Sequence, residues 1–212
     1  SRPRPALRAL FLSEAFYAPE NRGALIRSPV ELIVTTARQL DTPIHDLPAA
    51  ARAMSEMGQE LFQPPNVKGW DGGTKWINTA TVYHRYNGLR GLIFGDGRND
   101  RRRPMADEDV GESLGGPSPT KNAVSRLLFR DQPPYDPLPT LRTHQLSNAE
   151  SVVSYYVDTL LALPLPSEKR EVLVQYLDRD GQDKFSLNSI QAAERVRSLV
   201  FLICSTPEYQ AN

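Results

Sequence analysis

Apolar side chains recur every three or four residues along two stretches of the chain, residues 28–94 and 146–204, as they do in amphipathic helices. No alternating apolar and polar run longer than a few residues competes with this pattern. We therefore predict an all-α fold, with bundle-like packing of several helices and long irregular loops. The stripes include Val30, Ile33, Val34, Ala37 and Leu40; Leu47, Ala50, Met54 and Leu61; Val152, Val153, Tyr156 and Leu160; Val172, Leu173, Tyr176 and Leu177; and Ile190, Val196, Leu199 and Ile203.

Short polar motifs mark where these helices begin. Ser28 and Glu31 have the spacing of a capping box, in which each side chain accepts a hydrogen bond from the other residue's backbone N–H. Pro29 between them suits the first helical position, because its fixed φ is already helical. Asp46 and Thr74 are predicted to cap the next two helices. The caps predicted in the second stretch are Ser147, with Glu150 as its partner, and Ser167.

Residues 95–145 interrupt the periodicity. They are polar and rich in glycine, proline and charge, and only residues 122–129 have the pattern of a short helix. We interpret this range as an insertion or linker. The predicted organisation is an N-terminal helical segment over residues 1–94, the insertion, and a C-terminal three-helix segment over residues 146–212 that packs on the first.

The charge balance, the lack of a long apolar run and the single cysteine argue against several classes of function. The 25 basic and 25 acidic residues cancel, so no global field attracts nucleic acid. No apolar run is long enough to predict a transmembrane segment. No signal peptide is visible, and the start at Ser1 looks like a cut inside a longer protein. The single cysteine, Cys204, has an apolar flank that predicts a buried, inert thiol.

The segment FQPPNVKGWDGGTKWIN, residues 62–78, holds both tryptophans in a stretch rich in proline and glycine. One interpretation is a binding surface, because flat apolar rings beside polar groups suit sugars and peptides. The other is architectural: the tryptophans fill a gap between helices, and the polar groups satisfy the backbone of the turns. The second is favoured, and the first stays open. The candidate ligand- or partner-binding residues are Asn66, Lys68, Trp70, Trp76, Asn78 and His84.

No catalytic constellation, metal site or cofactor motif is visible, so we predict no catalytic residues, no metal and no cofactor. The three histidines are far apart, and none has a partner ligand at one-turn spacing. Residues 178–189 fail the EF-hand pattern, because glycine falls at the fourth position of the loop instead of the sixth. Glu31 could serve as a catalytic carboxylate, but the capping box explains it equally well.

Two long segments, EAFYAPENRGALIRSPVELIVTTARQL and GQELFQPPNVKGWDGGTKWINTATVYHRYN, together with the closing RVRSLVFLICSTPEYQ, resemble the bacterial family catalogued as domain of unknown function number 1800. The resemblance is to the C-terminal part of that family, over residues 8–93 and 146–210. The insertion and the WDGG form of the loop resemble planctomycete-type members. The resemblance implies an exported protein of the periplasm or cell envelope, often encoded beside an exported sulfatase-like protein.

These observations favour a binding or scaffolding module for a protein partner or an envelope polymer such as a polysaccharide. The alternative is part of a hydrolase acting on such a polymer, completed by an N-terminal half, with Glu31, His84 and Arg27 as its polar contributors. Paired carboxylates beside the tryptophans would favour the hydrolase. A third possibility is a self-assembling subunit, which would leave an extensive apolar face exposed.

Overall fold

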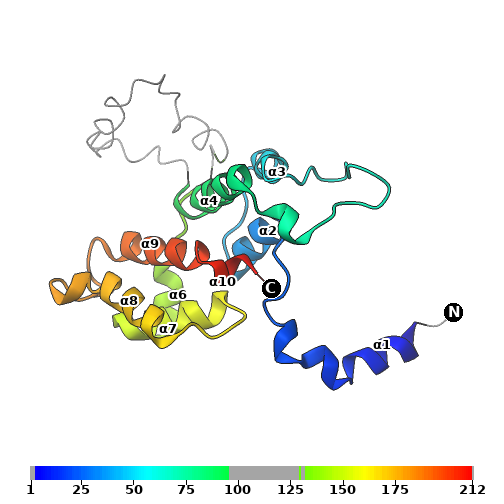
Figure 1. Ribbon diagram of the computed structural model, residues 1–212. Coiled ribbons are helices and arrows are strands. Elements are labelled where there is room, and N and C mark those ends of the chain that lie inside the picture. The colour runs from blue at the N-terminus through cyan, green and yellow to red at the C-terminus, as the bar shows by residue number, and fades with distance from the viewer. Residues whose placement is uncertain (1–2, 96–128, 130–131, 212) are drawn as a thin grey trace.

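The structure, a computed structural model, describes residues 3–95, 129 and 132–211 (Figure 1). Within these residues the regular elements are all helices, and the one extended pairing is an isolated bridge between Ile26 and Ala211. The all-α prediction is therefore confirmed. The α-helices are α1 (Arg4–Phe11), α2 (Pro29–Gln39), α3 (Leu47–Glu56), α4 (Thr79–Phe94), α6 (Leu138–Thr143), α7 (Ala149–Leu160), α8 (Ser167–Leu177), α9 (Ala192–Cys204) and α10 (Pro207–Gln210), with 3₁₀ turns η1 (Glu14–Tyr17), η2 (Pro19–Asn21), η3 (Gly73–Trp76) and η5 (Arg179–Gly181).

One hydrophobic core joins the two helical stretches of the chain. Helix α4 packs against α2, α3 and α9, while α7 packs against α8 and α9. Leu32, Leu89, Val153 and Leu199, from four different helices, are fully buried in the same cluster. Helix α1 lies outside this body and projects away from it at the N-terminal end (Figure 1), and none of its side chains is buried.

Part of the range 95–145 contributes to this core. The buried side chain of Gln132 donates from Nε2 to Pro43 O at 2.9 Å and accepts from the backbone N–H of His45 at 3.1 Å. The hydroxyls of Tyr135 and Tyr156 are 2.9 Å apart and also buried. The short helix expected over residues 122–129 lies outside the described residues, apart from the buried Phe129.

The capping predictions are confirmed at two helices. Glu31 Oε2 accepts from Ser28 N at 2.7 Å, and Ser28 Oγ accepts from Glu31 N at 3.3 Å, which completes the capping box. Asp46 Oδ1 accepts from Ala49 N at 2.9 Å at the start of α3.

Three predicted caps are wrong. Asn148, one residue after Ser147, has the extended backbone of an N-cap, and its Oδ1 accepts from Ser151 N at 2.9 Å. Ser167 is already helical, because α8 follows the extended Pro166 directly. Thr74 lies inside η3, and α4 begins instead after Asn78. In each case the N-cap is an asparagine or proline with an extended backbone, one to four residues from the residue that the sequence pattern selected.

The predicted apolar stripes are buried for the most part, with exceptions at the start of α3, on the outer face of α8 and before α9. Leu47 is exposed at the start of α3, and Val172 and Tyr176 lie on the outer face of α8. Ile190 precedes α9 and is fully exposed. Helical spacing alone does not distinguish the first or last turn, where a side chain can extend past the neighbouring helix.

The thiol of Cys204 is buried, as the sequence predicts. Burial raises its pKa to about 12, so the reactive thiolate is almost absent at neutral pH. We expect Ellman's reagent to leave the folded protein unlabelled at pH 8 and to titrate one thiol after unfolding in urea. Cys204→Ala is the blank for this measurement. Labelling of the native protein at the rate of a free thiol would contradict the buried position.

Candidate functional site

The segment between α3 and α4 is a long loop whose two ends are held together by Trp76. This side chain is 7% exposed. Its Cζ3 atom lies 3.9 Å from where a Cβ on Gly58 would stand, and its Nε1 lies 3.8 Å from the corresponding point on Gly72. The indole therefore packs between the beginning and the end of the loop. At the same base, Gln59 Oε1 accepts from Val30 N at 3.0 Å and ties the loop to α2.

Backbone turns shape the rest of this loop. Asn66 Oδ1 accepts from Lys68 N at 2.8 Å, and Asn66 O accepts from Gly69 N at 3.0 Å. This is an Asx turn, in which the side chain replaces a backbone acceptor. Asn78 Oδ1 accepts from the N–H groups of Ala80 and Thr81, both at 3.0 Å, and caps α4. The side-chain oxygens of Asn66 and Asn78 thus accept hydrogen bonds from nearby backbone N–H groups and stabilise the turn and the start of α4.

The outer part of the loop projects from the body of the molecule (Figure 1). It carries exposed apolar side chains. Phe62 is 94% exposed and Val67 is fully exposed, and the exposed Lys68 follows Val67. The two tryptophans behave differently, because Trp70 is only partly exposed and Trp76 is buried. Of the two rings that suggested a binding surface, Trp76 is buried and Trp70 keeps part of its surface exposed, while the most exposed apolar side chains of the loop are at residues that the sequence pattern did not select.

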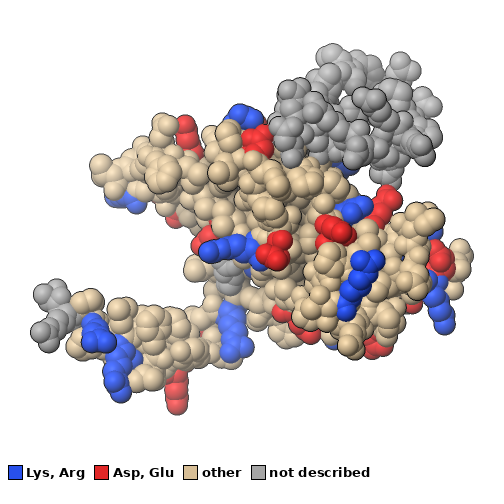
Figure 2. All heavy atoms as spheres, turned by 180° about the vertical axis from the view of Figure 1, so that it is seen from behind, with Lys and Arg blue, Asp and Glu red and all other residues tan. Residues whose placement is uncertain are grey.

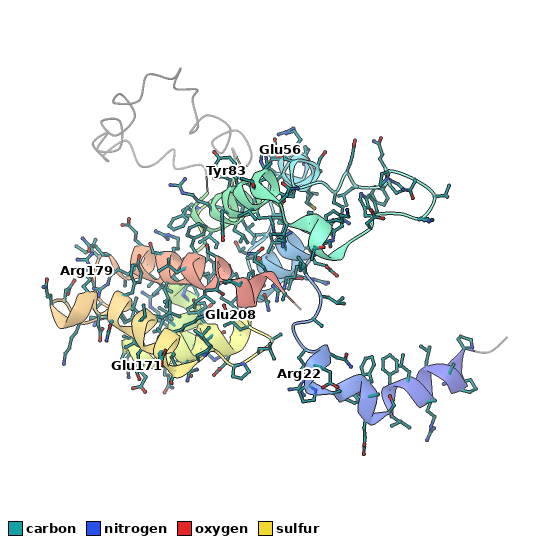
Figure 3. The ribbon with its side chains drawn as sticks, in the orientation of Figure 1. Arg22, Glu56, Tyr83, Glu171, Arg179 and Glu208 are labelled. Carbon is teal, nitrogen blue, oxygen red and sulfur yellow. The ribbon has the colours of Figure 1, made fainter. Side chains whose placement is uncertain are left out.

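His84 is engaged with the end of α3. Its Nδ1 lies 3.3 Å from Glu56 Oε2, and its ring makes an edge contact with Tyr83 at 5.6 Å between centroids. Glu56 and Tyr83 lie on the same side of the body (Figure 3). The structure thus places His84 in a polar contact between α3 and α4, beside the start of the loop.

The two other residues of the hydrolase alternative have structural roles. Glu31 is the second member of the capping box. Arg27 is buried with its guanidinium carbon 4.2 Å from the centroid of the Tyr209 ring, a cation–π contact. Within the described residues, no group of three or more His, Cys, Asp or Glu side chains could hold a metal ion. These positions therefore do not favour the hydrolase alternative.

A second region of interest lies where α4 meets α10. A pocket of about 330 Å³ opens there, with mostly apolar walls. Its lining includes Arg85, which is 1% exposed and fully embedded between the helices. The sequence does not indicate this region, because Arg85 has the spacing of an ordinary polar position on a helix and no local pattern shows that α10 covers it. The remaining lining residues are Ile26, Ile77, Val82, Tyr86, Pro207, Gln210 and Ala211.

The surface charge is mixed. Figure 2 shows basic and acidic side chains interspersed on one face of the molecule. No described helix has the length and hydrophobicity needed to cross a membrane.

Comparison with known families gives one match. The model of the family described as "Protein of unknown function (DUF1800)" matches residues 4–211. The chain belongs to this family. The search of curated proteins and the search of solved structures both gave no match.

In this DUF1800 chain, the sequence-predicted site divides by role. Asn66, Trp76 and Asn78 build the loop and its junction with α4, while His84 contacts α3. Lys68 remains an exposed side chain of the outer loop. Val67 follows Pro64 and Pro65, which prevent helix formation, so it belongs to no helical apolar stripe that would bury it, and this is the signal that could have indicated its exposure.

Proposed function

We propose that this DUF1800 chain is a binding module that presents the outer part of the α3–α4 loop, residues 59–75, to a protein partner. The observation that carries the proposal is the exposure of Phe62 and Val67 on a projecting loop whose base is tied to the core. A loop that is already ordered loses little conformational entropy when it binds, so more of its contact energy appears as affinity.

A protein partner fits this surface better than a polysaccharide. Carbohydrates are bound largely by stacking on exposed aromatic faces together with directed hydrogen bonds. Here Trp76 is buried, Trp70 is only partly exposed and Asn66 is used within its own turn, so Phe62 is the one largely exposed aromatic ring of residues 59–75. Phe62 and Val67, with Lys68 at the edge, are the kind of apolar anchors with a charged rim that protein interfaces use.

The resemblance to the C-terminal part of planctomycete-type members supports a more specific context. In that context we propose that the chain acts outside the cytoplasm, in the periplasm or cell envelope, and that its partner is an exported sulfatase-like protein of the kind that the resemblance implies is often encoded beside members of this family. The hydrolase alternative has no specific support in the geometry of Glu31, His84 and Arg27.

The proposal is tested by measuring the affinity of the purified chain for that sulfatase-like protein by calorimetry. We expect Phe62→Ser and Val67→Ser to weaken binding by about tenfold or more each, since interface anchors contribute on the order of 1–2 kcal/mol or above. Ile190→Ser is the matched control, because Ile190 is equally exposed but lies before α9, away from the loop. Absence of binding, or an equal effect of Ile190→Ser and Phe62→Ser, would overturn the proposal.

A further inference from the structure

The pocket between α4 and α10 contains a buried cation, Arg85, that has no acidic partner among the residues that the structure describes. Arg85 Nε donates to Gln210 Oε1 at 2.7 Å, and Nη2 donates to Arg27 O at 2.9 Å. Nη1 is buried and has no hydrogen-bond partner within the described part of the chain. Both acceptors are neutral, so among the described residues only dipoles solvate the charge of Arg85.

The guanidinium remains charged in this environment. Burial, and secondarily the charge of Arg27, lower the pKa of Arg85 from 12.5 to about 10. At neutral pH the side chain is therefore protonated. A buried charge without a counter-ion costs several kcal/mol, and a protein retains one chiefly where an anion can neutralise it.

The acidic residue closest to this pocket in the sequence does not supply the counter-charge. Glu208, on α10 between two lining residues, pairs with Lys169 from α8. Its position at α10 is marked in Figure 3. No ion pair joins Arg85 to a carboxylate in the described ranges 3–95, 129 and 132–211.

Gln210 occupies the place that such an anion would take. Its side-chain carbonyl accepts the Nε–H of Arg85, its amide donates to Cys204 O at 2.9 Å, and it lines the pocket while remaining only partly buried. A carboxylate that displaces Gln210 Oε1 would replace a neutral acceptor by a charged one. Charge-assisted hydrogen bonds to arginine are about twice as strong as neutral ones.

We propose that this pocket binds a small carboxylate with an apolar body, whose carboxyl group displaces the Gln210 side chain and pairs with Arg85. The apolar body lies against Ile26, Ile77 and Val82, and the volume of about 330 Å³ is at the lower end of the range for small-molecule sites. This site is distinct from the exposed loop of the proposed function and does not depend on it.

The first test compares hexanoate with hexanamide, which has nearly the same shape and no charge, by NMR titration of the full chain. We expect hexanoate to shift the backbone signals of Val82, Tyr86 and Gln210 and to bind about tenfold more tightly than hexanamide, since a hydrogen bond to a charged group contributes roughly 1.5–3 kcal/mol. Acetyl-leucine and its amide, run in parallel, distinguish a peptide carboxyl terminus from a free acid as the source of the ligand. Equal binding of acid and amide, or no binding of any of these acids, would overturn the proposal.

Two substitutions at Gln210 give opposite expected results. Gln210→Ala removes the side chain that covers Arg85 and should tighten hexanoate binding several-fold. Gln210→Glu supplies an internal carboxylate with the same shape and should abolish binding. A pocket that selects only apolar shape would leave hexanoate affinity unchanged in Gln210→Glu, and that result would also refute the role of Arg85. Neither substitution changes a residue of α4. Backbone chemical shifts of α4 that match those of the unsubstituted protein would therefore show that each variant keeps the fold.

Discussion

Replacing Trp76 by alanine is expected to lower the free energy of unfolding by about 3–5 kcal/mol, the usual cost of deleting a large buried aromatic side chain. The physical reason is its position between Gly58 and Gly72, the two ends of the α3–α4 loop. Without the indole, a cavity opens where these ends meet, and the loop loses the contact that closes it. Urea unfolding followed by circular dichroism measures the loss.

Trp70→Ala is the matched control, because the same side chain is removed from a partly exposed position in the same loop. We expect it to cost only about 1–2 kcal/mol, in proportion to the smaller apolar area removed from water. Equal losses for the two substitutions would show that Trp76 does not anchor the loop. A larger loss for Trp76→Ala than for Trp70→Ala would support the architectural interpretation of Trp76, and the binding measurements with Phe62→Ser and Val67→Ser test the other interpretation.

Much of the fold follows from local sequence patterns. The stripe at Ile33 and Ala37, the capping box of Ser28 and Glu31, and the Asp46 cap all depend on residues within one or two helical turns of each other. Such interactions are visible in the sequence because the partners lie at fixed spacings. The errors at Thr74, Ser147 and Ser167 are of the same local kind, and each comes from choosing one polar residue over a neighbour whose backbone is extended.

Contacts between residues far apart in the chain could not be predicted from such local patterns. Tyr135 and Tyr156 share a buried hydrogen bond because residues 132–137 return along α4, and the composition of residues 95–145 gives no indication of it. The burial of Arg85 likewise depends on α10, more than 120 positions later in the chain. A polar residue on an amphipathic helix is normally on its outer face, so helical spacing assigns Arg85 to solvent.

The polar residues of the candidate site are also explained by local interactions. Asn66 and Asn78 were selected as ligand-binding groups because amide side chains recognise ligands, yet both are used by nearby backbone N–H groups. A conformationally demanding loop requires such groups for its own turns before any remain for a partner. The exposed Phe62 and Val67 have no comparable local function, and this is why they carry the binding proposal.

Replacing Gly95 by alanine is the second substitution expected to have a large effect, a loss of about 2–6 kcal/mol in unfolding free energy. Gly95 ends α4 with φ 67° and ψ −162°, a backbone region that is essentially restricted to glycine and costs other residues about 1–3 kcal/mol. A Cβ there would also lie 2.3 Å from Gln132 O and 2.9 Å from Pro134 N. These are backbone atoms that cannot rotate away, so crowding adds a further cost of about 1–3 kcal/mol.

Gly69→Ala separates the two contributions to this loss. Gly69 also has a positive φ, 87°, but a Cβ there meets nothing within 4 Å, so only the backbone term applies. We expect Gly95→Ala to exceed Gly69→Ala in urea unfolding and, unlike it, to increase hydrogen exchange at the Tyr135 amide, which donates to Ile93 O at 2.9 Å. If both substitutions cost the same and the Tyr135 amide keeps its protection, residues 132–135 do not pack against the end of α4. The part of the range 95–145 that follows Gln132 would then be a surface linker, as its composition suggests, and not part of the core.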